Sequence, residues 1–148
     1  MRPSRWIVAV PALLAACSPA GETPVAGDAY IRLAAVPGRP SAAYFTLHGG
    51  ATDMTLVQVE VPGATRVELH NSRTTADGMV AMDAIPGVDL RSRGTVTFAP
   101  GAQHAMLYGL PATVKPGATV PLTLRFGDGS AIRADARVIA AGEAVPGA

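Results

Sequence analysis

Apolar and polar residues alternate with a period of two along most of the chain. Leu122, Leu124 and Phe126 alternate with polar residues, and so do the apolar residues of segment 132–138. Successive side chains of a strand point to opposite faces, so this pattern predicts strands with one buried face. On this basis we predict strands at 29–35, 42–48, 55–60, 66–71, 79–83, 95–98, 105–108, 119–126 and 131–139.

Turn signals separate these segments. Pro-Gly pairs follow several of them, and Gly-Asp-Gly at 127–129 separates the last two. Proline presets the φ angle of a turn, and glycine accepts the positive φ that some turns require. Many short strands without a long helical period predict a single all-β domain at residues 28–139, built as a β-sandwich or Greek-key barrel.

The first residues have a different pattern. Arg2 and Arg5 accompany an apolar stretch from Trp6 to Ala16. This stretch is shorter than the roughly 20 residues that a membrane-spanning helix needs, so residues 1–16 are predicted to be an export signal peptide. The segment ends in Leu-Ala-Ala-Cys, which resembles the bacterial lipobox, and we therefore expect Cys17 to carry a lipid. The alternative is an ordinary signal peptide that leaves Cys17 as a free thiol.

Segments at both ends of the predicted domain lack periodicity. Residues 17–27 begin with the lipidated cysteine and continue with Pro, Gly and Ala, which predicts a flexible tether. Residues 140–148 are expected to form a frayed tail. Lipid anchoring after export would place the domain in the cell envelope, at the periplasmic side of a membrane.

Charge and cysteine content exclude several function classes. Without Arg2 and Arg5 the chain has ten basic and eleven acidic residues, and it contains no basic run, so nucleic-acid binding is not expected. Cys17 is the only cysteine, which excludes paired-thiol redox chemistry and thiolate metal sites within the domain. No nucleophile elbow and no glycine-rich loop leading into a helix is present, so we do not expect an enzyme.

Histidines and methionines are the remaining candidates for chemistry. His104 and Met106 share one face of a predicted strand, with Cα atoms about 7 Å apart. A single methionine usually fills a core and a single histidine usually lies at a surface, so packing remains an alternative to a metal site. The exported chain has seven histidines and methionines in total, and five of them fall between positions 70 and 106: His70, Met79, Met82, His104 and Met106.

These residue types select a metal. Imidazole binds several transition metals, whereas the thioether of methionine is soft and favours Cu(I). A set of neutral ligands also suits a monovalent ion better than Cu(II). A blue-copper electron carrier is not expected, because its metal site requires a thiolate. Methionine resists the disulfide formation that would remove a cysteine ligand in an oxidising compartment.

The spacing of these residues resembles the signature of the periplasmic copper chaperone family PCu(A)C, His-(Met)-X10-Met-X21-His-X-Met. Here the pattern runs from His70 through Met82 to His104 and Met106. The surrounding segments VELHN, GMVAM and FAPGAQHAMLYGL are also similar to those of the family. The resemblance extends over roughly residues 28–137.

This resemblance implies a cupredoxin-like fold in which His70, Met82, His104 and Met106 bind one Cu(I). It implies a monomeric chaperone that delivers copper to the CuA centre of cytochrome c oxidase subunit II, beside a thioredoxin-like Sco partner, or that serves copper homeostasis. A lipoprotein β-domain that binds a protein or cell-wall partner without metal is the alternative function.

The chain departs from the family pattern at three places. Asn71 stands where the family often has a second methionine, which makes Met79 a candidate auxiliary ligand, with packing as the alternative. His48 stands where the family commonly has asparagine, and we expect it to be structural or at the surface. No histidine or methionine follows Val138, so we expect one Cu(I) site and no additional Cu(II) site.

Overall fold

The computed structural model describes residues 22–146, which form strands and turns without a helix. Residues 1–16 and Cys17 lie outside the described residues. Within these residues no helix is long and apolar enough to cross a membrane. The strands are β1 (Val25–Arg32), β2 (Ser41–His48), β3 (Met54–Glu60), β4 (Arg66–Thr74), β5 (Val80–Ala84), β6 (Val88–Leu90), β7 (Thr95–Phe98), β8 (Gln103–Tyr108), β9 (Thr119–Phe126) and β10 (Ala131–Ile139).

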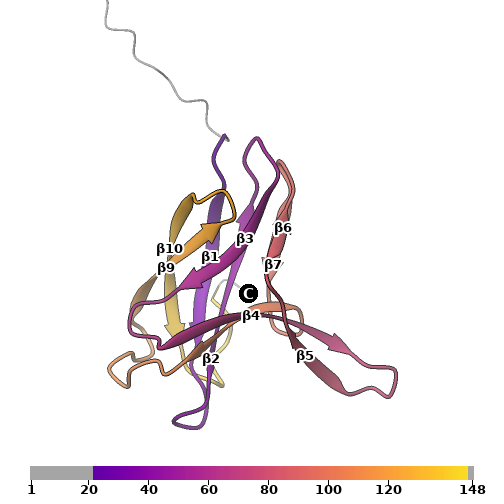
Figure 1. The fold of residues 1–148 in the computed structure, drawn as a ribbon. Helices are drawn as coiled ribbons and strands as arrows, with labels where there is room; N and C mark the ends of the chain where they lie inside the picture. The colour runs from indigo at the N-terminus through magenta and orange to yellow at the C-terminus, as the bar shows by residue number, and fades with distance from the viewer. Residues whose placement is uncertain (1–21, 147–148) are drawn as a thin grey trace, which may run out of the picture.

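The predicted all-β domain is confirmed. Each of the nine predicted strands is present, and β6 is an additional strand whose three residues are too few to show a period of two. The described strands form one sheet in the order β5-β4-β8-β2-β1-β10-β9-β3-β6, and β7 also pairs with β2. β1 and β10 are parallel, and their neighbours pair antiparallel. Figure 1 shows the strands curling around a common interior, with the β4–β5 hairpin projecting from the body.

The core lies on the inner face of this curled sheet. Phe45 of β2 and Phe98 of β7 stack with their ring centroids 4.2 Å apart. Leu122 and Leu124 of β9 are fully buried, whereas Arg125 between Leu124 and Phe126 is exposed. Burial of each large apolar side chain contributes about 1.5–3 kcal/mol to folding, so this face provides the main driving force.

The same alternation separates core and candidate ligands on β8. Ala105 and Leu107 are fully buried on the inner face. His104 and Met106 therefore point to the outer face of the sheet. The candidate site is consequently built on the outside of the barrel and is separated from the apolar core by the strand itself.

A second, smaller apolar cluster covers part of the outer face. Tyr30, Tyr44 and Ile139 form it, and Val145 from the C-terminal segment packs against it. The Arg32 guanidinium donates hydrogen bonds to three backbone carbonyls of the same segment. The segment from Ala140 to Val145, for which we expected a frayed tail, is therefore fastened across strands β1, β2 and β10.

Candidate metal centre

Strand β4 occupies the position between the two segments that carry the other candidate ligands. On one side its His70 pairs with His104 of β8, and on the other side its Ser72 pairs with Met82 of β5. Directly paired residues point to the same face, and a separation of two keeps that face. His70, Met82, His104 and Met106 therefore share the outer face of three adjacent strands.

The two histidines are direct cross-strand neighbours. Their ring centroids are 5.7 Å apart and the ring planes differ by 29°. His104 is only 5% exposed and the His70 side chain 12% exposed. The ring of Tyr44, a member of the outer apolar cluster, has its centroid 6.3 Å from that of the His104 ring. Both imidazoles are thus held at one place with little contact with solvent.

The nitrogens of His70 have very different surroundings. Its Nε2 lies 3.1 Å from Oε2 of Glu68, two residues earlier on β4. Its Nδ1 is buried and has no hydrogen-bond partner. A buried polar atom left unpaired costs about 1–3 kcal/mol, so it calls for an explanation. A metal ion would satisfy this nitrogen, and the site therefore fits a metal-binding role.

The nitrogens of His104 are also unlike each other. Nδ1 lies 3.1 Å from the carbonyl oxygen of Ala102, with which it forms a hydrogen bond. A carbonyl oxygen can only accept, so Nδ1 carries a proton, and in the neutral tautomer the lone pair is on Nε2. A neutral imidazole with an available nitrogen is the form in which histidine binds metals.

The two methionines differ in exposure. Met106 is half-buried on β8, and it pairs with Glu68 on one side and Ala42 on the other. Met82 is 55% exposed on the projecting hairpin. It is the diagonal neighbour of His70, a relation that places Cα atoms about 7–8 Å apart, within reach of a long thioether side chain. Three candidate ligands are thus sheltered by the body and one extends from the hairpin.

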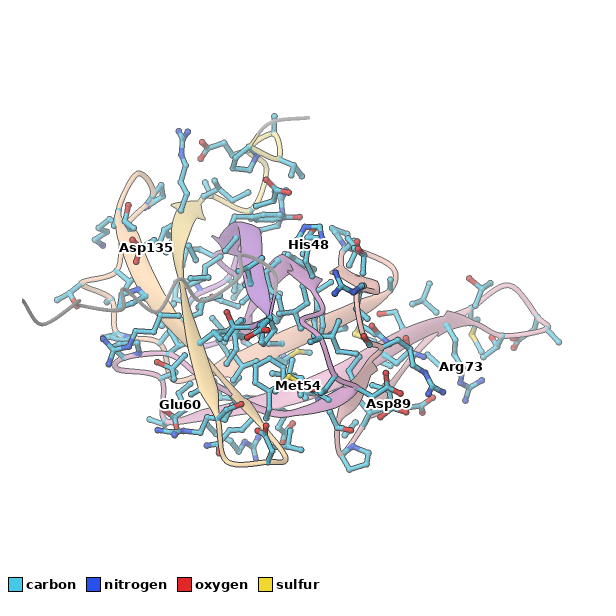
Figure 2. All side chains as sticks on the ribbon, turned by 90° about the horizontal axis from the view of Figure 1, so that it is seen from above. His48, Met54, Glu60, Arg73, Asp89 and Asp135 are labelled. Carbon is cyan, nitrogen blue, oxygen red and sulfur yellow. The ribbon has the colours of Figure 1, made fainter. Side chains whose placement is uncertain are left out.

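The auxiliary candidate Met79 and the third histidine, His48, lie apart from these four. Met79 is 65% exposed just before β5, and its odd separation from Met82 favours the opposite face of the hairpin. His48 is exposed at the end of β2, where its Nδ1 lies 3.2 Å from Oγ1 of Thr95. Figure 2 shows His48 on the body of the molecule, whereas Arg73 marks the hairpin.

Glu68 is a neighbour of the site that the sequence did not single out. Its carboxylate contacts His70, and Arg66 Nε lies 3.4 Å from Oε1. Hydrogen bonds from His70 and Tyr108, with the charge of Arg66, lower the pKa of Glu68, so it is ionised at neutral pH. The available signal was its two-residue separation from His70, which puts both on one strand face.

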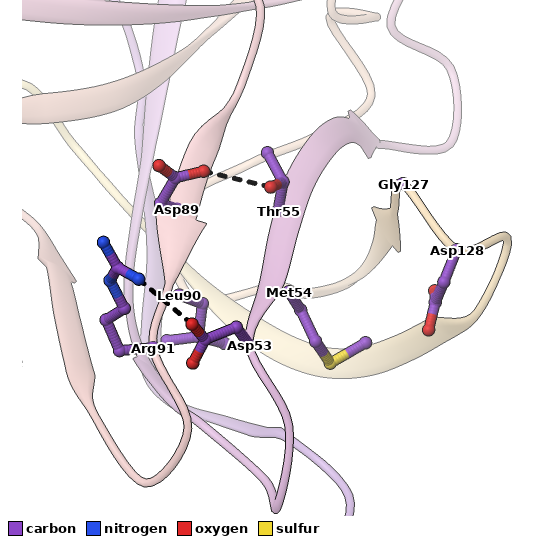
Figure 3. A pocket seen from close by; sticks show the side chains of 8 residues that line it. All are labelled: Asp53, Met54, Thr55, Asp89, Leu90, Arg91, Gly127 and Asp128. Carbon is purple, nitrogen blue, oxygen red and sulfur yellow. Dashed lines mark hydrogen bonds and ion pairs between the residues drawn. The ribbon is translucent and has the colours of Figure 1, made fainter.

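A pocket elsewhere on the surface contains none of the four candidate ligands. It has a volume of about 310 Å³ and lies between β3, β6 and the β9–β10 turn. As Figure 3 shows, Asp53 pairs with Arg91, and Asp89 accepts a hydrogen bond from Thr55. Asp128 accepts hydrogen bonds from the backbone N–H and the hydroxyl of Ser130, so all three aspartates of the pocket are partnered within the protein. Separately, residues 22–146 contain no group of three or more His, Cys, Asp and Glu arranged to hold a metal ion.

Sequence comparison relates the chain to a lipoprotein family. The LpqE-like family, described as "Putative lipoprotein LpqE-like", matches residues 25–138. A relative from Leifsonia xyli subsp. xyli, named "Putative lipoprotein Lxx21020", is 36% identical over 67 residues. This match covers 45% of the chain and only 40% of the relative.

Several solved structures are similar to this domain. The Cu(I) form of DR1885 from Deinococcus radiodurans is 34% identical, with a TM-score of 0.61 over 78% of this chain and 76% of that protein. Apo-DR1885 is 28% identical, with a TM-score of 0.60 over 97% and 98%. The copper-bound PCuAC domain of PmoF2 is 19% identical, with a TM-score of 0.65 over 80% and 93%, and shows similarity of fold. The chain therefore belongs to the LpqE-like family, and it has the fold of PCuAC domains, as its resemblance to the PCu(A)C family implies.

Proposed function

We propose that this protein is a Cu(I) carrier in which His70, Met82, His104 and Met106 bind one copper ion as cargo. The observation that carries the proposal is the strand register, which brings these four residues to one face. The unpartnered, buried Nδ1 of His70 supports a metal at this place. The copper-bound state of similar domains supports copper as that metal.

The ligand set favours the monovalent ion. Two thioethers and two neutral imidazoles are soft or borderline ligands without negative charge, a combination that suits Cu(I). The four ligands differ in solvent exposure, and this difference would permit release of the copper ion. The exposed Met82 can be replaced by a ligand of an acceptor protein while the other three ligands still hold the ion. The protein is therefore a carrier in this proposal and has no catalytic role.

The cell-envelope setting is part of the same proposal. Residues 1–16 serve as the signal peptide, Cys17 carries the lipid, and the copper domain acts as a monomer. The tether is shorter than the expected residues 17–27, because Val25 to Gly27 already belong to β1 and pair with β2. The lipoprotein descriptions of the family and of the Leifsonia relative support this arrangement. Metabolic labelling with a radioactive fatty acid would detect the lipid, and Cys17→Ser would abolish the label.

Copper binding is tested by titrating the protein with Cu(I) against a competing chelator. We expect one ion per chain and a strong loss of affinity in the double variant His104→Ala, Met106→Ala. His48→Ala is the matched control. It removes an exposed histidine from the end of β2 that is far from Ala42, the residue of β2 that pairs with Met106. Unchanged affinity in the double variant would refute the site, and a complete lack of copper in the wild type would favour the metal-free partner-binding alternative.

For the destination of the copper we propose the CuA centre of cytochrome c oxidase subunit II, with a Sco-type protein as partner; copper homeostasis is the other destination. Deleting the gene should lower oxidase activity under copper limitation, and added copper should restore it. Normal oxidase activity together with increased copper sensitivity would instead assign the protein to copper homeostasis.

A further inference from the structure

The carboxylate of Glu68 contacts the candidate ligand His70, but Glu68 is not itself one of the four candidate ligands. It contacts Nε2 of His70 at 3.1 Å. An ionised carboxylate can only accept hydrogen bonds, so the proton of a neutral His70 must reside on Nε2. The same contact leaves the lone pair of the ring on Nδ1, which is the buried nitrogen without a partner.

Glu68 is itself held in place by its neighbours. Arg66 Nε lies 3.4 Å from Oε1 of Glu68, which leaves Oε2 facing His70. The Arg66 guanidinium in turn lies 4.1 Å from the centroid of the Tyr108 ring. These contacts run along the outer face of β4 and β8 and end at the imidazole. They orient the carboxylate toward His70 before any metal arrives.

From this arrangement we propose that Glu68 is a positioning residue that selects the Nε2–H tautomer of His70 and thereby makes Nδ1 its copper-binding atom. This inference rests on the proposed copper site. His104 has the opposite arrangement, because the carbonyl of Ala102 holds the proton of the neutral ring on Nδ1 and leaves the lone pair of Nε2 to bind copper. The two histidines therefore bind copper through different ring nitrogens.

The two orienting partners have different chemical consequences. Ala102 offers a neutral backbone carbonyl, whereas Glu68 offers a negative charge. A carboxylate hydrogen-bonded to a ligating imidazole fixes the ring and increases its basicity. The charge of Glu68 also faces the positive charge that the otherwise neutral ligand set acquires with Cu(I). Glu68 therefore strengthens copper binding without touching the metal.

The tautomer is read directly from long-range ¹H–¹⁵N spectra of the imidazole nitrogens in the metal-free protein. We expect a protonated Nε2 and a bare Nδ1 for His70 in the wild type and in Glu68→Gln, whose amide oxygen can still accept the hydrogen bond. Glu68→Leu should produce a mixture of tautomers. A wild-type His70 with its proton on Nδ1 would overturn the proposal, whether or not the variants fold.

Copper titrations provide the second readout. Glu68→Leu should weaken Cu(I) binding by roughly 10–100-fold, and Glu68→Gln should recover much of the loss. Glu60→Leu is the matched control, because it breaks a carboxylate–arginine pair with Arg125, located between β3 and β9 and away from the site. In the wild type, Cu(I) should shift Nδ1 of His70 and Nε2 of His104. A shift of Nε2 of His70 instead would refute the assignment.

Failure of this inference can be separated from failure of the proposed function. A protein that shows the expected tautomers but does not bind Cu(I) would refute the copper site while retaining the role of Glu68. A protein that binds Cu(I) with equal affinity in the wild type and in Glu68→Leu would retain the site and refute the role of Glu68.

Discussion

At the scale of single residues, the candidate ligands differ in how firmly the fold holds them. His104 is almost fully buried and hydrogen-bonded to a backbone carbonyl, and His70 is flanked by Glu68. Met82 is more than half exposed on a projecting hairpin. A ligand with such freedom costs little to displace, because few packing contacts are lost when it moves.

Met82→Leu should weaken Cu(I) binding without lowering stability, because an exposed thioether contributes a ligand and little packing. The loss should exceed the roughly 10–100-fold expected when only the hydrogen-bond partner of a ligand is removed. Met79→Leu is the matched control three residues away, and its affinity should equal that of the wild type. Chelator competition measures both, and equal losses in the two variants would contradict the predicted ligand set.

Asp53 should give the protein a pH-dependent part of its stability. The backbone N–H of Ser92 and the guanidinium of Arg91 lower the pKa of this carboxyl below its ordinary value. A lowered pKa in the folded state stabilises the protein above the unfolded value of about 3.9, and this contribution disappears as pH falls through the folded pKa. Asp53→Asn should therefore be less stable than the wild type at pH 7.

Urea unfolding at pH 7 and near pH 3 checks this prediction. The difference in midpoint between wild type and Asp53→Asn should shrink at the lower pH. Asp135→Asn, at an exposed position on β10, is the control. A difference that is the same at both pH values would mean that the ionised carboxylate of Asp53 is not the stabilising group.

At the scale of elements, β8 performs two tasks on its two faces. Ala105 and Leu107 pack into the core, while His104 and Met106 point outward. Because of the strand period of two, the side chains that stabilise the core and the side chains proposed to bind the metal lie on opposite faces of one strand of six residues.

Leu107→Ala tests this separation. It should lower the free energy of unfolding by about 2–5 kcal/mol, because it leaves a cavity under a fully buried side chain. Its Cu(I) affinity, measured on folded protein, should stay near that of the wild type. Met106→Leu should do the reverse, with near-normal stability and weakened binding. If both variants lost stability and affinity together, the two faces of β8 would not be independent.

Gly109, directly after β8, should tolerate no side chain. Its φ is +63°, and an added Cβ would collide with the side chain of Thr65. Gly109→Ala should therefore destabilise the protein by about 1–3 kcal/mol through backbone strain and this contact. Gly27→Ala is the control, because a Cβ there has open space and an ordinary φ. Thermal unfolding compares them, and equal melting temperatures would argue against the turn as described.

At the scale of the whole molecule, the curled sheet closes over its core and the C-terminal segment fastens onto its outside. Arg32 of β1 donates hydrogen bonds to the carbonyls of Ala140, Ala141 and Glu143. Val145 packs on the cluster that contains Tyr44, whose ring also faces His104. The end of the domain is thus connected to the surroundings of the candidate site.

Arg32→Ala should release this segment. Hydrogen bonds to a charged group contribute about 1.5–3 kcal/mol, and we expect a loss of stability in that range. Amide hydrogen exchange of residues 140–145 should accelerate strongly, while the core strands remain protected. Arg133→Ala, at an exposed position on β10, is the control. Unchanged exchange in Arg32→Ala would show that other contacts hold the segment.

Local patterns in the sequence account for much of the fold. The alternation in β9 and β10 and the Pro-Gly turns identify strands because they depend on neighbouring residues alone. The resemblance of the spacing from His70 through Met82 to Met106 to the PCu(A)C signature also indicates the candidate ligands, and the strand period of two already places His104 and Met106 on one face. These predictions need no information about which strands are adjacent.

The tertiary structure alone decided what depends on distant parts of the chain. β6 exists because it pairs with β3, since its three residues carry too little local signal. The pairing of β4 with both β5 and β8 places Met82 and His104 on either side of His70. Docking of Arg32 on residues 140–143 also requires the folded arrangement. Alternation is a property of one strand, whereas register and docking arise only when segments that are distant in the sequence meet.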